Sequence, residues 1–209
     1  MKADMSHEIP EGMNPDAQET WPSKELISSF LGDFDFEFRP GEDSFIPGDE
    51  AAMAAARQFR DVLGRFASGV TVVTAMSAGQ PIGMTCQSFS SVSLSPPLVL
   101  FIPAKTSRAW PLIQRAGKFC VNLLAFEQAA ISNVMATKGI DKFESLPWKP
   151  TESTGSPLLE GVLGWIDCTV HSVHEAGDHY VVIGRVQEMG STDAKDPLLF
   201  FEGSYRRPE

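Results

Sequence analysis

Short β-type runs at close spacing constrain the fold of this 209-residue chain more than any other feature. Residues 70–76 (VTVVTAM), 97–103 (PLVLFIP) and 118–124 (KFCVNLL) are rich in β-branched and aliphatic side chains. Residues 164–191 predict two long strands joined by a turn at Gly177-Asp178. Many strands at short spacing, with few helices between them, favour a barrel or a sandwich over a doubly wound parallel sheet.

One long helix is expected at residues 51–69, where an alanine run has high helix propensity. Phe59, Val62, Leu63 and Phe66 follow at positions i, i+3, i+4 and i+7, which is one face of a helix. We expect this apolar stripe to pack in the core and Gly69 to provide a left-handed C-cap.

Two shorter helices are expected between the strands. One covers residues 105–114 and would be capped by Thr106 or Ser107, and the other covers residues 126–136. Residues 136–164 contain several prolines and predict loops.

The acidic excess is confined to the N-terminal quarter of the chain. Residues 1–50 hold 13 Asp and Glu against 3 Lys and Arg, whereas residues 51–209 hold 14 of each. The balanced part has no basic surplus for nucleic acid, and the acidic part opposes an anionic membrane surface. No apolar run is long enough for a signal peptide or a membrane span. From the charge distribution and the lack of such a run, we expect neither nucleic acid nor a membrane as a partner.

The charge split predicts two regions. Residues 1–50 form an acidic N-terminal extension, partly disordered or acting as a docking arm, and residues 51–209 form the folded domain. Within the extension, Phe30–Phe38 alternates Phe with acidic residues, which fits either an edge strand or a solvated tail with exposed aromatics.

Cysteine and histidine usage predicts neither disulfides nor a metal site. Cys86, Cys120 and Cys168 are odd in number and widely spaced, as expected of reduced thiols in a cytoplasmic protein. His171 and His174 are three apart and would point to opposite faces of a strand, so we predict no bound metal.

Residues 83–101 (GMTCQSFSSVSLSPPLVLF) place five serines, a threonine and a glutamine beside a strongly apolar run. Small residues let a backbone approach a flat ligand closely, so that its N–H and C=O groups can bond the edge of a heteroaromatic ring. Residues 105–110 (KTSRAW) follow, and cations and hydroxyls at a helix start can bind an anion. The two segments together suit a ligand with a large apolar ring and an anionic tail.

Other catalytic motifs are absent from the sequence. It holds no GxGxxG after a strand, no Walker A, no GxSxG and no HExxH, which disfavours a nicotinamide enzyme on a Rossmann fold.

The chain resembles the short-chain flavin reductases, the reductase components of two-component aromatic hydroxylases. The segments FRDVLGRFASGVTVVTA, GMTCQSFSSVSLSPPLVLFIPAKTSRAWPLI, FCVNLLA and GDHYVVIGRV carry the resemblance, which covers residues 57–207. It implies a mainly β, Greek-key split β-barrel with a few peripheral helices, usually a homodimer. It also implies that NADH, with NADPH possible, reduces a diffusible FAD or FMN for a separate oxygenase.

The resemblance also implies the site residues. Thr85, Gln87 and Ser88 would lie nearest the isoalloxazine ring, Ser107 would take the phosphate end, and His179 would contact the nicotinamide nucleotide as the catalytic residue. The family often has Asn or Ala where this chain has Cys86-Gln87. The complete implied set is Gly83, Met84, Thr85, Cys86, Gln87, Ser88, Phe89, Ser90, Ser91, Lys105, Thr106, Ser107, Arg108, Trp110, Gly177, Asp178 and His179.

Two other functions remain open from the sequence. A barrel of the same class could hold flavin or haem tightly as an electron carrier or sensor, or it could be an FMN oxidase similar to pyridoxamine-phosphate oxidase. The choice between FAD and FMN also stays open. So does the choice between NADH and NADPH, since Lys105, Arg108 or Arg185 could bind the 2′-phosphate of NADPH.

Overall fold

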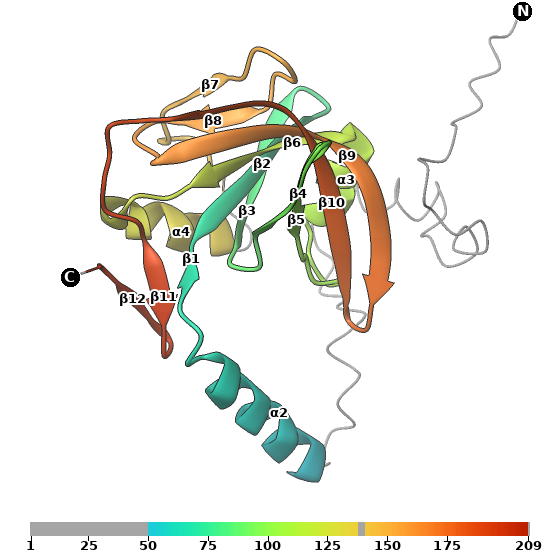
Figure 1. Ribbon diagram of the computed structural model, residues 1–209, viewed down its shortest axis with the longest axis vertical. Helices are drawn as coiled ribbons and strands as arrows, with labels where there is room; N and C mark the ends of the chain where they lie inside the picture. The colour runs from blue at the N-terminus through green and yellow to red at the C-terminus, as the bar shows by residue number, and fades with distance from the viewer. Residues whose placement is uncertain (1–49, 138–140, 209) are drawn as a thin grey trace, which may run out of the picture.

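A single antiparallel sheet of seven strands dominates the computed structural model, which describes residues 50–137 and 141–208 (Figure 1). The strands follow the order β3-β2-β6-β9-β10-β5-β4. Because β3 and β4 are neighbours in the chain but lie at opposite ends of this order, the curved sheet forms a barrel that is split between them. The expected mainly β split barrel is confirmed. Its strands are β2 (Thr71–Ser77), β3 (Gln80–Cys86), β4 (Ser90–Leu94), β5 (Pro97–Phe101), β6 (Lys118–Leu123), β9 (Gly164–Ala176) and β10 (His179–Ser191).

Smaller elements surround this sheet. β1 (Ser68–Gly69), β11 (Leu199–Phe201) and β12 (Ser204–Arg206) form a second sheet, and β7 (Trp148–Pro150) pairs with β8 (Pro157–Leu159). The helices are α2 (Glu50–Leu63), α3 (Trp110–Ala116), the 3₁₀ turn η2 (Phe126–Gln128) and α4 (Ala129–Ala136). Within the described residues, none of these helices is both long and apolar enough to cross a membrane.

Two hydrophobic cores lie on opposite faces of β2. Val73 packs in the first core with Phe101 and Phe119, and Val72 packs in the second with Leu124 and Leu198. Successive side chains of a strand point to opposite faces, so a strand covered on both faces buries most of its side chains. This explains why residues 70–76 are mainly β-branched and aliphatic, and the two buried threonines, Thr71 and Thr74, donate their hydroxyls to backbone carbonyls.

Most of the predicted elements are found. The strands at 70–76, 97–103 and 118–124 and the long hairpin at 164–191 are confirmed, and residues 126–136 fold as η2 and α4. The run at 82–94 is divided by a link at residues 87–89 into β3 and β4. The segment Phe30–Phe38 and the rest of residues 1–49 lie outside the described residues.

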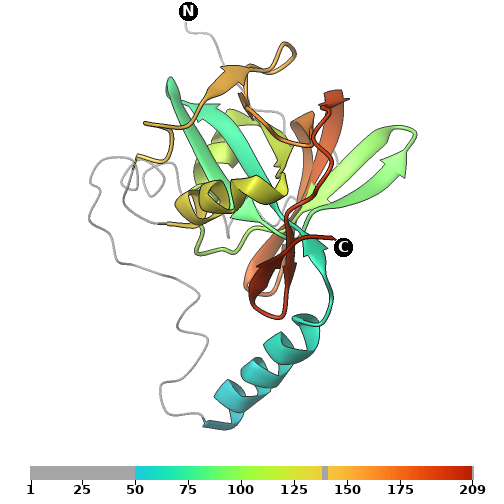
Figure 2. The ribbon, with the colours of Figure 1, turned by 90° about the vertical axis from the view of Figure 1, so that its left-hand side faces the viewer.

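The prediction for residues 51–69 is wrong in two respects. α2 ends at Leu63, and Gly69 lies in β1 without a left-handed φ, so it is not a C-cap. The apolar stripe is not in the core: Phe59 is 65% exposed and Phe66 is 78% exposed. The reason is visible in Figures 1 and 2, where α2 projects away from the barrel.

Candidate functional site

The strand β3 carries the first part of the implied site, and both of its faces are covered. A Cβ atom on Gly83 would lie 2.9 Å from Met135 Sδ and 3.3 Å from Phe143 Cζ, so a larger residue there would require these side chains to shift. Thr85 Oγ1 donates a hydrogen bond of 2.6 Å to the carbonyl of Ser132 in α4. The alternate residues of the strand, Met84 and Cys86, pack against the first core. A ligand on this strand would therefore meet the backbone more than the side chains.

The link between β3 and β4 joins the strand to the end of β5. Ser88 Oγ accepts a hydrogen bond from Ile102 N–H at 3.0 Å and donates one to the Ile102 carbonyl at 3.1 Å. Gln87, Ser90 and Ser91 are exposed, and Phe89 is half-buried. Of the residues expected nearest a flavin ring, Gln87 is exposed and its Oε1 accepts a hydrogen bond from Ser68 Oγ at 3.4 Å, whereas the hydroxyls of Thr85 and Ser88 bond backbone carbonyls within the protein.

Residues 104–108 form a turn and not the start of a helix. α3 begins at Trp110 with Ala109 as its N-cap, so the expected helix over 105–114 starts later than predicted and neither Thr106 nor Ser107 is its N-cap. Ser107 Oγ nevertheless accepts a hydrogen bond from Trp110 N–H at 3.2 Å and lies 3.6 Å from Met84 Sδ. This turn is placed directly beside β3.

The turn of the β9–β10 hairpin lies against the same segment. Lys105 N–H donates to the Asp178 carbonyl at 2.8 Å, and Ala104 forms a β-bridge with His179. Lys105 Nζ lies 3.1 Å from Glu175 Oε2 and sits over the ring of Tyr180, 5.5 Å from its centroid. Three segments that are far apart in the sequence, at 83–91, 104–108 and 177–179, are therefore neighbours in space.

His179 and Asp178 form a pair at the surface of this turn. His179 Nδ1 lies 2.7 Å from Asp178 Oδ1, and the two side chains are 42% and 67% exposed. The hydrogen bond from His179 holds the pKa of the Asp178 carboxyl below its ordinary value. The pairing orients the imidazole and leaves Nε2 on the other side of the ring.

Trp110 differs from its expected role as an aromatic plane at the site. It is 2% exposed, and its ring packs in the first core against Phe101, with a centroid distance of 5.8 Å, and beside Tyr180. It therefore lies beneath the candidate site and offers no open ring face in the single chain. Among buried side chains of the described residues, its indole Nε1 is one of two polar atoms without a hydrogen-bond partner.

The histidines of the hairpin do not converge on a common point. His174 Nε2 lies 3.1 Å from Ser172 Oγ, whereas His179 bonds Asp178. Within residues 50–137 and 141–208, no group of three or more His, Cys, Asp or Glu side chains is placed to hold a metal ion.

The buried thiols are poor nucleophiles. Burial, aided by the nearby Asp167 carboxyl, raises the pKa of Cys168 to about 12 and raises that of Cys120 as well. Both side chains are fully buried. Neither thiol is placed for covalent catalysis.

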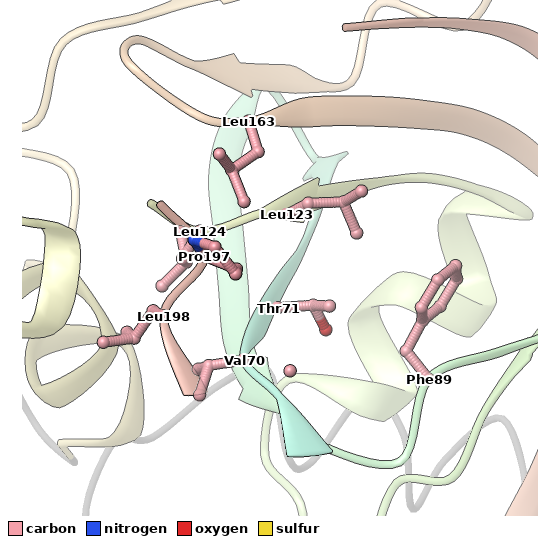
Figure 3. Close-up of a pocket in the computed structure, with 9 residues that line it drawn as sticks. Val70, Thr71, Phe89, Leu123, Leu124, Leu163, Pro197 and Leu198 are labelled. Carbon is pink, nitrogen blue, oxygen red and sulfur yellow. The ribbon is translucent and has the colours of Figure 1, made fainter. Parts of the chain in front are cut away.

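A cavity lies beside the candidate site. It has a volume of about 220 Å³ and is apolar, with Val70 and Leu198 on one side and Phe89 on the other (Figure 3). Phe89 is its one residue from the implied set. This volume is below the usual range for ligand pockets, about 300–1,000 Å³. Apart from Phe89, the implied residues do not line this cavity.

One contact at β3 has no signal in the local sequence. Lys142, in the loop after α4, donates a hydrogen bond of 3.2 Å to the Gly83 carbonyl. It lies 59 residues from Gly83, and only the folded chain brings the two together.

These features define a split barrel in which residues 83–91, 104–108 and 177–179 lie next to one another, with Lys105 among them. Residues 63–209 match the family model described as the flavin reductase like domain. The chain therefore belongs to the flavin reductase-like family.

Relatives of this family share most of the chain. The reductase subunit HsaB of a flavin-dependent monooxygenase from Rhodococcus jostii is 49% identical over 166 residues, which are 78% of this chain and 84% of the relative. The structure of nitrilotriacetate monooxygenase component B from Mycobacterium thermoresistibile superposes with a TM-score of 0.74 at 45% identity, covering 76% of this chain and 89% of that one. The NADH:FAD oxidoreductase SgcE6 of Streptomyces globisporus, in complex with NAD and FAD fragments, gives a TM-score of 0.69 at 36% identity, covering 75% and 94%.

Proposed function

We propose that this protein is a flavin reductase that uses NAD(P)H to reduce FAD or FMN, and that the reduced flavin diffuses to a separate oxygenase, an aromatic hydroxylase. The single observation that carries the proposal is the convergence of residues 83–91, 104–108 and 177–179 on one surface of a flavin reductase-like barrel. The related HsaB is named as the reductase subunit of a flavin-dependent monooxygenase, and the related Mycobacterium protein as component B of nitrilotriacetate monooxygenase.

The residues of the surface suit a flavin nucleotide. A flavin and a nicotinamide supply the hydride-transfer chemistry when both are bound, and the protein supplies binding and orientation. The β3 backbone, which Gly83 keeps close to α4, would support the ring edge, and its N–H groups would stabilise negative charge there. His179, oriented by Asp178, would contact the nicotinamide nucleotide.

The phosphate end would be held by the turn at residues 104–108. Ser107 and Lys105 belong to this turn, and Lys105 already pairs with Glu175. An exposed ion pair of this kind contributes no more than about 1 kcal/mol, so exchanging Glu175 for a phosphate costs little.

We propose NADH as the preferred nicotinamide nucleotide. Glu175 and Asp178 place two carboxylates beside His179, and these would repel an added 2′-phosphate. SgcE6 is named as an NADH:FAD oxidoreductase. Steady-state kcat/KM values with NADH and NADPH, each measured with FAD and with FMN, test both choices.

We also propose that the protein is a homodimer. The large apolar side chains Phe59, Val62, Leu63 and Phe66 are all more than half exposed in the single chain. Apolar side chains gathered on one helix are typical of an interaction surface. A second copy of the chain is the occupant that the family resemblance suggests.

The colour of the purified protein separates this function from its alternatives. A reductase of diffusible flavin is expected to purify nearly colourless and to oxidise NADH only when free flavin is added. An electron carrier or an FMN oxidase would be yellow, or red if it held haem. A yellow protein that does not turn over NADH with added flavin would contradict the proposal.

A further inference from the structure

The outer edge of β3 is held by α4 and by the loop that follows it. β3 stands at the end of the sheet order, so β2 is its one strand neighbour in the described sheet. Lys142 Nζ donates to the Gly83 carbonyl at 3.2 Å and to the Met135 carbonyl, in the last turn of α4, at 2.6 Å. One ammonium group thus joins the C-terminal end of α4 to the middle of β3.

A second contact joins the same two elements. Thr85 Oγ1 donates to the Ser132 carbonyl at 2.6 Å, and Gly83 and Thr85, being two residues apart, lie on the same face of β3. From the other side, Tyr205 OH donates to Ser132 Oγ at 2.8 Å, which ties α4 to the C-terminal hairpin β11–β12. α4 is therefore anchored both to β3 and to the smaller sheet.

The Lys142 ammonium is suited to this position. A cation near the C-terminus of a helix interacts favourably with the helix dipole, and hydrogen bonds from a charged donor are stronger than neutral ones. The ammonium is half-buried, and its desolvation lowers the pKa of Lys142. Both bonds go to backbone carbonyls, so they restrain the main chain of β3 and not a side chain.

We propose that Lys142 is a positioning residue for the cofactor strand. By fixing the Gly83 carbonyl against α4, it holds the β3 backbone in the position that the flavin ring needs, so that little ordering remains to be done on binding. Lys142 itself does not touch the cofactor in this arrangement. The inference rests on the proposed function, because it assumes that β3 contacts a flavin.

The test compares three variants of the full-length protein in flavin titrations and steady-state assays. Lys142→Met removes the donor and is expected to weaken FAD binding about tenfold, because the β3 backbone must then be ordered when the cofactor binds. The KM for NADH and the kcat at saturating flavin are expected to stay within about twofold. Lys142→Arg, which keeps a charged donor, is expected to restore FAD binding to within about threefold. Lys149→Met, an exposed lysine on β7, is the matched control and should bind FAD as the wild type does.

Three outcomes would overturn the proposal in distinguishable ways. If Lys142→Met melts at a lower temperature but binds FAD as the wild type does, the residue is merely structural. If the wild-type protein itself binds no flavin, the proposed function fails and this role fails with it. Should Lys142→Met not fold, Lys142→Gln keeps a shorter neutral donor, and unchanged FAD binding by that variant would equally reject the positioning role.

Discussion

At the scale of single residues, some side chains of the candidate site bond the backbone of neighbouring elements, and others point toward solvent. The hydroxyls of Thr85 and Ser88 bond the backbone of neighbouring elements, whereas Gln87 and His179 present polar groups toward solvent. Thr85 and Ser88 therefore join β3 and the link after it to their surroundings. The sequence pattern could not reveal this, because a hydroxyl that binds a ligand and one that binds a distant carbonyl look the same in a sequence.

His179 is expected to act on the nicotinamide nucleotide and not on the flavin. His179→Ala should raise the KM for NADH about tenfold, as expected from the loss of roughly one hydrogen bond, and should change flavin affinity less. Stopped-flow or steady-state kinetics with varied NADH give the KM, and fluorescence titration gives the flavin Kd.

His174→Ala is the matched control for His179, because His174 lies on the same hairpin and bonds Ser172. It should leave both constants unchanged. Loss of flavin binding by His179→Ala with an unchanged KM for NADH would show that the role of His179 has been assigned wrongly.

Asp167 is expected to make stability depend on pH. Its carboxylate is fully buried, accepts hydrogen bonds from Thr154 N–H and Oγ1, and lies opposite Glu188 across β9–β10. Burial raises its pKa above the ordinary value, so the folded protein holds the proton more tightly than the unfolded chain does. The stabilisation from Asp167 is thus greatest below the ordinary pKa and declines as pH rises through the raised one.

Urea unfolding between pH 4 and pH 7 measures this effect. The free energy of unfolding of the wild type minus that of Asp167→Asn should fall as pH rises. For one proton, this difference should fall by at most about 1.4 kcal/mol per pH unit. The asparagine variant has no carboxyl at this position to titrate. A difference that stays constant or grows with pH would contradict the assignment.

At the scale of elements, strands were easier to predict than helix ends. β2 could be predicted because burial on both faces makes its sequence rich in β-branched and aliphatic residues, and the hairpin could be predicted because Gly177, with a φ of 63°, marks its turn. The start of α3 was predicted wrongly because Thr106 and Ser107 are good capping residues by type. In the folded chain, the bridge from Ala104 to His179 and the bond from Lys105 hold this segment against the hairpin, so a long-range contact overrides local propensity.

The β9–β10 hairpin is expected to be sensitive to a single added methyl group. An irregularity in the β9–β10 register falls between Ile183 and Gly184, and a Cβ on Gly184 would lie 2.4 Å from Cζ of the fully buried Phe119. Gly184→Ala should therefore lower the free energy of unfolding by about 1–3 kcal/mol, as overpacking does. Chemical denaturation measures this loss.

Gly69→Ala is the control for Gly184→Ala. No atom lies within 4 Å of the position of its added Cβ, and its φ is not positive, so its stability should change by less than about 0.5 kcal/mol. Equal losses in the two variants would mean that the added methyl group is not resisted by Phe119.

At the scale of the whole molecule, the candidate site is an assembly of distant segments. The hydroxyl-rich run, the KTSR turn and the Gly-Asp-His turn could each be picked out from the sequence, and the resemblance predicted that they belong together. Lys142 could not be picked out, because its contact with Gly83 depends on the path of the chain around α4. The apolar face of α2 was predicted to pack in the core, but no packing partner for it is found within the described part of its own chain.

That unpartnered face leads to a prediction about assembly. If a second copy covers α2 and the segment after it, an aspartate at Val62 or Phe66 would have to be buried without a partner in the dimer, while it would stay solvated in the single chain. Val62→Asp and Phe66→Asp should each weaken dimerisation by about 2 kcal/mol or more, which is roughly thirtyfold in the dissociation constant.

Sedimentation equilibrium of the full-length protein measures that constant, and circular dichroism should show that the variants remain folded. Lys149→Asp introduces the same side chain at an exposed position on β7 and should leave the dimer intact. A wild-type protein that sediments as a monomer at tens of micromolar, or variants that dimerise as tightly as the wild type, would show that the apolar face of α2 is not a contact between copies.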